Sequence, residues 1–330
     1  MIGMSNGRVV WMNGTLVPEA DARVSIYDSA LMFGDMVFEM TRSFNKRQFK
    51  LRDHLERLYV GLKILRIPLE MSIEEMERHC HQTVEANEPF FGEDDEHRLM
   101  IDVSRGILGI YQSVEGLREG ANVVIADFPL RWTVAGMGRL FHEGINAVVT
   151  SQRAIPSTLL NPKIKSRSRI HYLMANIEAS SMAGRDNWAL LLDPDGFIAE
   201  GTGDNFFIIK GGTIITPEGR NILRGISRAY VTEELAPQLG MPAIERNIEP
   251  YDVYVADEAF MTGTPFCMLP VTRVNGLAVG DGRVGTGFKR LLSKWSEGVG
   301  VDIESQIRHW NDVDAAPGSD SPTPYEFKSR

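Results

Sequence analysis

The stretch NPKIKSRSRIHYLMANIEA (residues 161–179) places two lysines, Lys163 and Lys165, directly before an apolar pattern of helical spacing. Four apolar residues fall on one face at this spacing: Ile170, Leu173, Met174 and Ile177. The pattern predicts an amphipathic helix that begins near Ser166, and Gly184 stands where a C-terminal cap belongs.

The two lysines are expected between this helix and a strand at residues 145–150, which are apolar and β-branched. A helix N-terminus and a pocket of low dielectric both disfavour an ammonium group, so they lower a lysine's pKa. A neutral amine at pH 7 can form a Schiff base with an aldehyde. Most lysines instead keep their charged group in water, and the spacing alone does not decide between these two states.

A second stretch, GFIAEGTGDNFFII at residues 196–209, favours the chemical interpretation. With the first it belongs to a series of six motifs: VSIYDSALMFGDMVFEMTR, LRDHLERL, PKIKSRSRIHYLMANIEA, FIAEGTGDNFF, ILRGISRAYV, and FMTGTP with PVTRVNG. In this order the motifs resemble the fold-type IV pyridoxal-phosphate (PLP) enzymes, most closely the branched-chain amino acid aminotransferases. D-amino acid aminotransferases, (R)-amine transaminases and aminodeoxychorismate lyases share this fold. The resemblance extends from about residue 10 to about residue 292.

The resemblance and the length together predict a two-domain α/β (α+β) protein. A chain of 330 residues exceeds what a single core usually supports. We expect a small N-terminal α/β domain at residues 1–128 and a linker at 129–137. A larger C-terminal PLP-binding domain, a strand-rich pseudo-barrel, is expected at 138–313. Residues 314–330 are rich in Pro, Ser and Asp and are expected to form a flexible tail.

Local patterns predict several elements within this frame. Helices are expected at residues 52–67 and 72–87, the second opened by a capping box of Ser72 and Glu75. Strands are expected at the following ranges: 9–17 as a hairpin about Asn13-Gly14, 24–27, 98–105 paired with 122–128, 258–264 and 268–274. A helix is expected at residues 225–239.

Composition limits the partners and the compartment. The chain is 43% hydrophobic and 24% charged, as in soluble globular proteins. The net charge of −9 argues against nucleic acid or an anionic membrane as the main partner. We find no apolar run of transmembrane length, no signal peptide and no metal-ligand spacing at Cys80 and Cys267. The expected location is the cytoplasm.

The resemblance assigns residues to the cofactor. Lys165, in the IKS context, corresponds to the lysine that binds PLP and moves the substrate proton. Glu200 corresponds to the carboxylate that keeps the ring nitrogen protonated. The implied phosphate ligands are Arg57, Gly225, Ile226, Ser227 and Thr264. The first amides of a helix at residues 226–227 suit an anion, and a guanidinium offers forked donors.

One cofactor contact of the family has no direct counterpart. A tyrosine shortly after the lysine can reach the phenolic oxygen of PLP, but Ile170 stands at the matching offset here. Tyr172 is nearby at a different offset, and Arg169 is expected to reach that region instead.

On the substrate side the implied residues are Phe33, Glu39, Arg98, Arg105, Gly263 and Pro265. Phe33 replaces a tyrosine of the branched-chain enzymes, and Glu96 replaces another, two residues before Arg98. The D-amino acid enzymes use an Arg-x-His pair, of which Arg105 is present while Ile107 replaces the histidine. We expect Arg105 to bind the substrate carboxylate, with Arg98 in a supporting or structural role.

The implied function is transamination between an amino acid, branched-chain-like, and a 2-oxo acid by a ping-pong mechanism in a homodimer. Three alternatives stay open: transamination of D-amino acids or (R)-amines, a PLP lyase of the aminodeoxychorismate type, and a non-catalytic scaffold. A lyase needs no oxo-acid acceptor, and a scaffold would not bind PLP.

Overall fold

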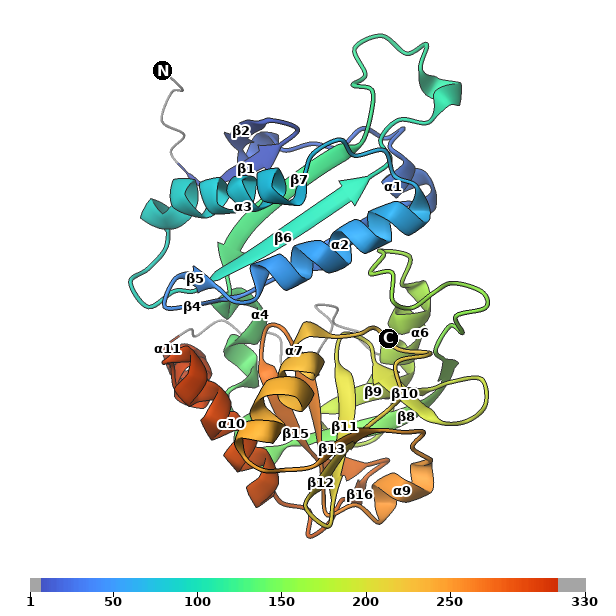
Figure 1. The fold of residues 1–330 in the computed structure, drawn as a ribbon, viewed down its shortest axis with the longest axis vertical. Helices are drawn as coiled ribbons and strands as arrows, with labels where there is room; N and C mark the ends of the chain where they lie inside the picture. The colour runs from blue at the N-terminus through green and yellow to red at the C-terminus, as the bar shows by residue number, and fades with distance from the viewer. Residues whose placement is uncertain (1–6, 314–330) are drawn as a thin grey trace. The chain divides into compact units, whose positions relative to one another are not determined.

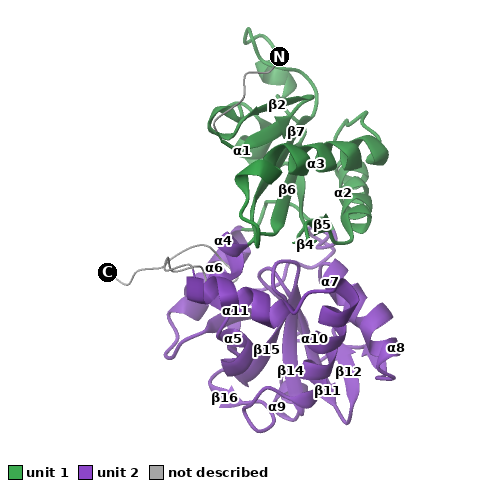
Figure 2. Ribbon diagram, turned by 90° about the vertical axis from the view of Figure 1, so that its left-hand side faces the viewer, with its two compact units in different colours: residues 1–130, 164–169 green, residues 131–163, 170–330 purple. Residues whose placement is uncertain are grey.

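The computed structural model describes residues 7–313, which form two compact units (Figure 2). Among the described residues, the first unit comprises 7–130 and 164–169, and the second comprises 131–163 and 170–313. The tail expected at 314–330 lies outside the described residues.

The first unit is built on a five-stranded sheet of order β2-β1-β7-β6-β3, in which all neighbours are antiparallel. Its strands are β1 (Val9–Met12), β2 (Thr15–Pro18), β3 (Met36–Met40), β6 (His97–Ser104) and β7 (Asn122–Pro129). A separate hairpin joins β4 (Ser43–Phe44) and β5 (Arg47–Gln48). Its helices are η1 (Glu19–Asp21), α1 (Ser29–Phe33), α2 (Leu51–Leu65), α3 (Ile73–Asn87), η2 (Glu88–Phe90) and η3 (Gly109–Tyr111).

Helices α2 and α3 pack on one face of this sheet (Figure 1). The leucine stripe of α2 and the apolar side of α3, with Met76 and Cys80, are buried against strand residues such as Leu99 and Ile101. At the start of α3, the Ser72 side chain accepts from the Glu75 amide and the Glu75 carboxylate accepts from the Ser72 amide. The capping box predicted from the sequence is therefore present.

Residues 164–166 extend this unit beyond β3, which is the last strand of the sheet. The Phe38 amide donates to the Lys165 carbonyl over 2.9 Å, and Val37 forms a bridge with Ser166. The exposed backbone groups of an edge strand need partners. This pairing explains why the lysine segment, expected in the C-terminal domain, clusters with the first unit.

The second unit contains a nine-stranded sheet of order β10-β9-β8-β15-β14-β11-β12-β13, with β16 paired to β15. An additional β10–β11 pairing closes six of these strands into a ring, as a barrel requires. The strands are β8 (Ile145–Arg153), β9 (Asn187–Leu192), β10 (Ile198–Gly201), β11 (Asn205–Lys210), β12 (Thr213–Thr216), β13 (Ala243–Glu245), β14 (Glu258–Gly263), β15 (Cys267–Val274) and β16 (Leu277–Ala278).

Helices surround this ring of strands. They are α4 (Arg131–Val134), η4 (Ala135–Met137), α5 (Leu140–Glu143), α6 (Ile170–Ser180), α7 (Ile226–Ala229), a π-helix (Tyr230–Leu235), α8 (Ala236–Gln238), α9 (Pro250–Tyr254), α10 (Thr286–Val299) and α11 (Ile303–Val313). Residues 131–137, expected in the linker, thus form helical turns with Val134, Ala135 and Met137 buried.

Helix α6 differs most from its prediction. It begins at Ile170 rather than near Ser166, because residues 164–166 pair with β3. Its buried residues are Ala175, Asn176 and Ala179, whereas Ile170 is 71% exposed. The small alanines allow the helix to lie close against β8 and β9. The strand expected at 24–27 is absent: residues 24–25 have no regular structure, and residues 26–27 form a turn.

No helix within residues 7–313 is long and apolar enough to cross a lipid bilayer.

Candidate active site

Lys165 lies in the first unit, and its Nζ is 5.0 Å from the centre of the Phe38 ring. The guanidinium carbons of Arg167 and Arg169 lie 3.7 and 4.9 Å from the same ring centre. Arg169 Nε also donates to the Ser166 carbonyl over 2.8 Å. Lys165 is therefore one of three cationic side chains around a single aromatic ring, an arrangement that favours anionic ligands nearby.

The helix-dipole argument for Lys165 is wrong, because α6 begins five residues after the lysine and the dipole acts within the first turn. Lys163 instead donates from Nζ to the Arg220 carbonyl over 2.8 Å, in the second unit. Burial and the charge of Arg224 lower the pKa of Lys163. The two lysines therefore have different surroundings.

Glu39 is buried beneath α2, and both of its carboxylate oxygens have partners. Arg57 Nε and Nη2 donate to them over 2.6 and 2.8 Å, and His54 Nδ1 contacts Oε2 at 2.8 Å. Burial alone would raise the pKa of Glu39, but the charge of Arg57 and the contact with His54 outweigh it and hold the pKa well below its usual range. Burial lowers the pKa of His54.

This contact set changes the interpretation of Glu39. A carboxylate that accepts two guanidinium hydrogen bonds and one from an imidazole orients the guanidinium rather than a substrate. Glu39, expected among the substrate residues, thus positions Arg57, which α2 presents from the expected phosphate-binding motif.

Arg98 lies on the sheet face opposite to Glu39. On β6 it lies on the same face as Met100 and Asp102, which pair with Met40 and Phe38 of β3, whereas Glu39 pairs with Ile101 on the other face. Its Nη1 is enclosed and has no hydrogen-bond partner among residues 7–313. Burial, followed by the charges of Arg167 and Arg42, lowers the pKa of Arg98 to about 9. An enclosed cationic donor of this kind suits a carboxylate ligand.

Arg105, by contrast, is held by the protein itself. Its Nε and Nη2 donate to Asp35 over 2.6 and 3.2 Å. Nη1 and Nη2 also donate to the carbonyls of Arg66 and Leu65 over 2.8 and 2.7 Å. These contacts fix the end of α2 to the segment after β6 and do not support Arg105 as the main carboxylate ligand.

Glu96 has a structural role and does not pair with Arg98. Its carboxylate accepts from Ser43 Oγ and from the amides of Asn45 and Lys46, at 2.8 and 3.0 Å for the two amides. Asn45 and Lys46 both have positive φ, as a tight hairpin turn requires. Phe33, at the end of α1, is 67% exposed.

Glu200 lies on β10 in the second unit and is 4% exposed. Tyr172 Oη donates to its Oε1 over 2.8 Å. Asn205 Nδ2 and the Leu223 amide each donate to Oε2 over 3.0 Å. Three donors therefore compensate the burial of this carboxylate.

The turn before α7 lies close to the same group of residues. A Cβ on Gly225 would lie 2.1 Å from Asn205 Oδ1, so that only glycine fits beside this amide. Ile226 and Ser227 form the first turn of a continuous helical run, and the first amides of a helix have no intrahelical acceptor. These amides can bind an anion.

Thr264 and Pro265 lie in the turn between β14 and β15. Gly263 ends β14, and a Cβ there would lie 2.7 Å from Phe266 Cζ. The glycine thus leaves room for the Phe266 ring within this turn. Glu200, the residues 225–227 and this turn all belong to the second unit, whereas Lys165, Arg57 and Arg98 belong to the first.

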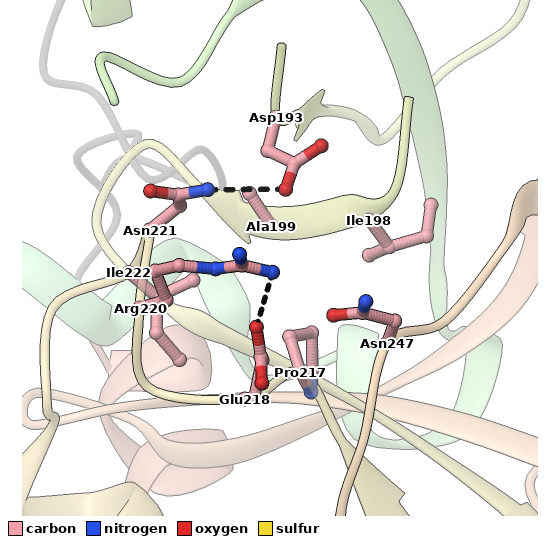
Figure 3. Close-up of a pocket in the computed structure, with 9 residues that line it drawn as sticks. All are labelled: Asp193, Ile198, Ala199, Pro217, Glu218, Arg220, Asn221, Ile222 and Asn247. Atoms are coloured by element: carbon pink, nitrogen blue, oxygen red, sulfur yellow. Dashed lines mark hydrogen bonds and ion pairs between the residues drawn. The ribbon is translucent and has the colours of Figure 1, made fainter. Parts of the chain in front are cut away.

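A pocket in the second unit adjoins the segment that carries Leu223 (Figure 3). Asn221 Nδ2 donates to Asp193 Oδ2 over 3.1 Å, and Arg220 pairs with Glu218 at 2.5 Å (Figure 3). The lining residues are Asp193, Ile198, Ala199, Pro217, Glu218, Arg220, Asn221, Ile222 and Asn247. None of the residues assigned to chemistry lines this pocket, and its bonds fix the segment leading to Leu223.

Asp204 is buried next to this site, and neither of its carboxylate oxygens has a hydrogen-bond partner within residues 7–313. Burial and the nearby charge of Glu200 raise the pKa of Asp204 well above its ordinary value. The folded protein therefore holds this proton more tightly than the unfolded chain. Its stabilising effect is full below the ordinary pKa and is lost as the pH rises through the folded-state pKa.

We therefore expect the Asp204→Asn variant to gain stability over the wild type as the pH rises from about 4. Urea unfolding at a series of pH values, at equal protein concentration, measures this difference. Asp195→Asn, at an exposed position, controls for the change of net charge. Parallel curves for wild type and Asp204→Asn would show that Asp204 ionises normally in the folded protein.

Comparisons with known proteins show the family of the chain. A family model described as amino-transferase class IV matches residues 36–274. A putative branched-chain-amino-acid aminotransferase of Methanocaldococcus jannaschii is 36% identical over 289 residues, which cover 87% of this chain and 95% of the relative. The branched-chain-amino-acid aminotransferase of Escherichia coli is 32% identical over 292 residues, which cover 86% and 90%.

Solved structures give the same result. A crystal structure of the Escherichia coli branched-chain amino acid aminotransferase matches with a TM-score of 0.77 at 29% identity, covering 86% of this chain and 92% of that one. The enzyme of Thermobaculum terrenum, solved in its PLP form, matches with a TM-score of 0.76 at 27% identity, covering 92% and 97%.

Proposed function

Because the chain belongs to the amino-transferase class IV family and is an aminotransferase, we propose that it uses PLP to exchange amino groups between branched-chain-like amino acids and 2-oxo acids. The reaction follows a ping-pong course, in which the oxo-acid product leaves before the acceptor binds. The observation that carries the proposal is the buried carboxylate of Glu200 with its three donors, which suits a protonated ring nitrogen.

The residues fit the cofactor by their chemistry. Lys165 offers an amine, and Glu200 a buried carboxylate. Arg57 offers a guanidinium oriented by Glu39, and the amides of Ile226 and Ser227 begin a helix. The remaining proposed ligands are Gly225, Thr264 and Arg169.

When bound, PLP supplies an electron-accepting ring that stabilises negative charge at the substrate Cα. Lys165 Nζ would move the proton between that carbon and the C4′ carbon of the cofactor. Glu200 would keep the ring nitrogen protonated. Arg57, the amides at residues 226–227 and the Thr264 hydroxyl would hold the phosphate.

The test of this proposal is a panel of substrates. L- and D-amino acids and chiral amines are offered with pyruvate and with 2-oxoglutarate, and the oxo product is measured. The proposal predicts turnover of L-leucine, L-isoleucine and L-valine that requires an oxo-acid acceptor. Turnover without an acceptor would indicate a lyase, and exclusive use of D-amino acids or (R)-amines would indicate the opposite stereochemistry.

Arg98, rather than Arg105, is the proposed ligand of a substrate carboxylate. The support is the enclosed Nη1 of Arg98, whereas Arg105 is engaged by Asp35 and two carbonyls. Phe33, Gly263 and Pro265 remain proposed substrate neighbours.

We expect Arg98→Ala to raise the KM for amino acids on the order of 10-fold or more, the loss typical of one charge-assisted contact. The KM for an amine without a carboxylate is expected to change much less. Arg105→Ala serves as the comparison. It is expected to lower the unfolding midpoint and to change the KM for amino acids and for the amine by similar factors. If only Arg105→Ala raised the KM for amino acids selectively, Arg105 and not Arg98 would be the carboxylate ligand.

We further propose a homodimer in the cytoplasm. Large apolar side chains at Ile26, Leu31 and Phe33 are more than 60% exposed within one short segment, as at an interaction surface. Both cysteines, Cys80 and Cys267, are free thiols, which are typical of reducing compartments. Light scattering over a dilution series tests the dimer, and a monomer at micromolar concentration would contradict it.

A further inference from the structure

Tyr172 connects helix α6 to the carboxylate of Glu200. It lies in the first turn of α6 and packs against a cluster of small and apolar residues that includes Ala175, Ala189 and Ala199. From there its hydroxyl reaches the Glu200 carboxylate over 2.8 Å. The sequence pattern had placed the apolar face of this helix on other residues, so Tyr172 was not expected to point inward.

The two oxygens of Glu200 are held by different kinds of donor. Oε2 accepts from the Leu223 amide and from Asn205, whose Nδ2 also donates to the Leu223 carbonyl over 2.9 Å. These donors come from the backbone and from an amide that is itself fixed. Oε1 accepts from the Tyr172 hydroxyl, which reaches it from a separate helix.

The Leu223 side of this arrangement is rigid for a further reason. Asn221 joins the segment before Leu223 to Asp193, and Lys163 Nζ donates to the Arg220 carbonyl. Rotation of the Glu200 carboxylate is therefore opposed on Oε2 by the Leu223 amide and Asn205, and on Oε1 by the Tyr172 phenol. Without the phenol, the protein restrains the orientation of the carboxylate less tightly at Oε1.

We propose that Tyr172 is a positioning residue that fixes the orientation and the basicity of Glu200, and thereby the protonation of the cofactor ring. The inference rests on the proposed role of Glu200. Donors to a carboxylate stabilise its ionised form and restrict its rotation, and the Tyr172 hydroxyl does this at Oε1. Tyr172 acts through Glu200 and not by direct contact with the substrate.

The Tyr172→Phe variant tests this inference because it removes the hydroxyl and keeps the ring that packs in the apolar cluster. We expect kcat to fall on the order of 10-fold, the effect of one hydrogen bond to a charged group, while KM changes little. Tyr59→Phe is the matched control. Tyr59 donates to the Met71 and Ser72 carbonyls in the first unit, outside the proposed machinery.

A double-mutant cycle with Glu200→Gln separates positioning from packing. If Tyr172 acts through Glu200, Tyr172→Phe lowers kcat by much less than 10-fold when Glu200→Gln is already present. A second readout needs no turnover: the pH titration of the bound cofactor's absorbance, without substrate, is expected to shift in Tyr172→Phe and to shift no further when Glu200→Gln is already present.

The outcomes distinguish the two proposals. If Tyr172→Phe lowered kcat equally in the wild type and in Glu200→Gln, and did not shift the titration of the cofactor's absorbance, the role of Tyr172 would be overturned. The assignment of Glu200 would be unaffected. Wild-type kcat and an unchanged titration in Glu200→Gln would instead overturn the assignment of Glu200 itself. A loss of the same size in Tyr59→Phe would identify a general effect of removing a buried phenol and would also count against Tyr172.

Discussion

Replacement of Lys165 by alanine is expected to abolish transamination, whereas Lys163→Ala is expected to keep most of the wild-type activity. Lys165 Nζ lies beside the Phe38 ring in the unit that also holds Arg57 and its partner Glu39. Lys163 Nζ donates to a backbone carbonyl and serves to fix a turn. Without the Lys165 amine, the remaining lysine of the pair is engaged by the Arg220 carbonyl, so covalent attachment of the cofactor and proton transfer at the substrate Cα are expected to be lost.

Steady-state turnover and the absorbance of the bound cofactor measure this difference. Addition of a small primary amine to Lys165→Ala supplies a control, since partial recovery of turnover indicates that the amine itself was missing and not the fold. Activity that survives in Lys165→Ala but disappears in Lys163→Ala would reverse the assignment of the two lysines.

Glu200→Gln is expected to bind PLP and to transaminate at least about 100-fold more slowly, on the scale of a preorganised electrostatic group. Glutamine can keep its oxygen toward Asn205 and the Leu223 amide while its NH₂ group faces Tyr172, whose hydroxyl can also accept a hydrogen bond. The fold should therefore tolerate the change. What is lost is the negative charge that keeps the ring nitrogen protonated.

The measurement combines kcat with the affinity for PLP and the thermal unfolding midpoint. Affinity and midpoint close to those of the wild type would confine the loss to the chemical step. A Glu200→Gln variant with wild-type kcat would show that another group is the partner of the ring nitrogen.

Local patterns predicted the fold well where local physics controls it. The leucine stripe of α2 and the capping box of α3 gave helix bounds within two residues, because both signals lie within the helices or directly at their ends. The two-domain fold-type IV class is confirmed by the solved structures that match. Helix α6 was placed too early because residues 164–166 pair with β3, a long-range contact that no local pattern indicates.

For the site, the sequence motifs predicted which residues take part but not how their side chains are arranged. The motifs indicated Lys165, Glu200 and Arg57 as candidate residues but did not indicate the contacts of each side chain. Glu39 was expected beside the substrate, yet the arrangement of β3 against α2 turns it toward Arg57 and His54. Arg105 was ranked above Arg98 as the carboxylate ligand, because no local pattern indicates that Asp35 and carbonyls at the end of α2 engage Arg105.

Other contributors became visible only in three dimensions. The contact of Tyr172 with Glu200 depends on which face of α6 is buried, and the spacing from the lysine does not indicate it. Asn205, five residues after Glu200 in the GTGDN run, donates to the same carboxylate. The spacing alone could have suggested a hairpin pair, since Glu200 and Asn205 lie opposite each other across β10 and β11.

The central claim, that Lys165 carries the cofactor, is tested most directly by borohydride reduction of the PLP-loaded protein followed by peptide mapping. Reduction attaches the pyridoxyl group permanently to the lysine that held it. We predict the label on Lys165, in the peptide that contains Ile164 and Ser166. A label on Lys163, or on neither lysine, would contradict the account.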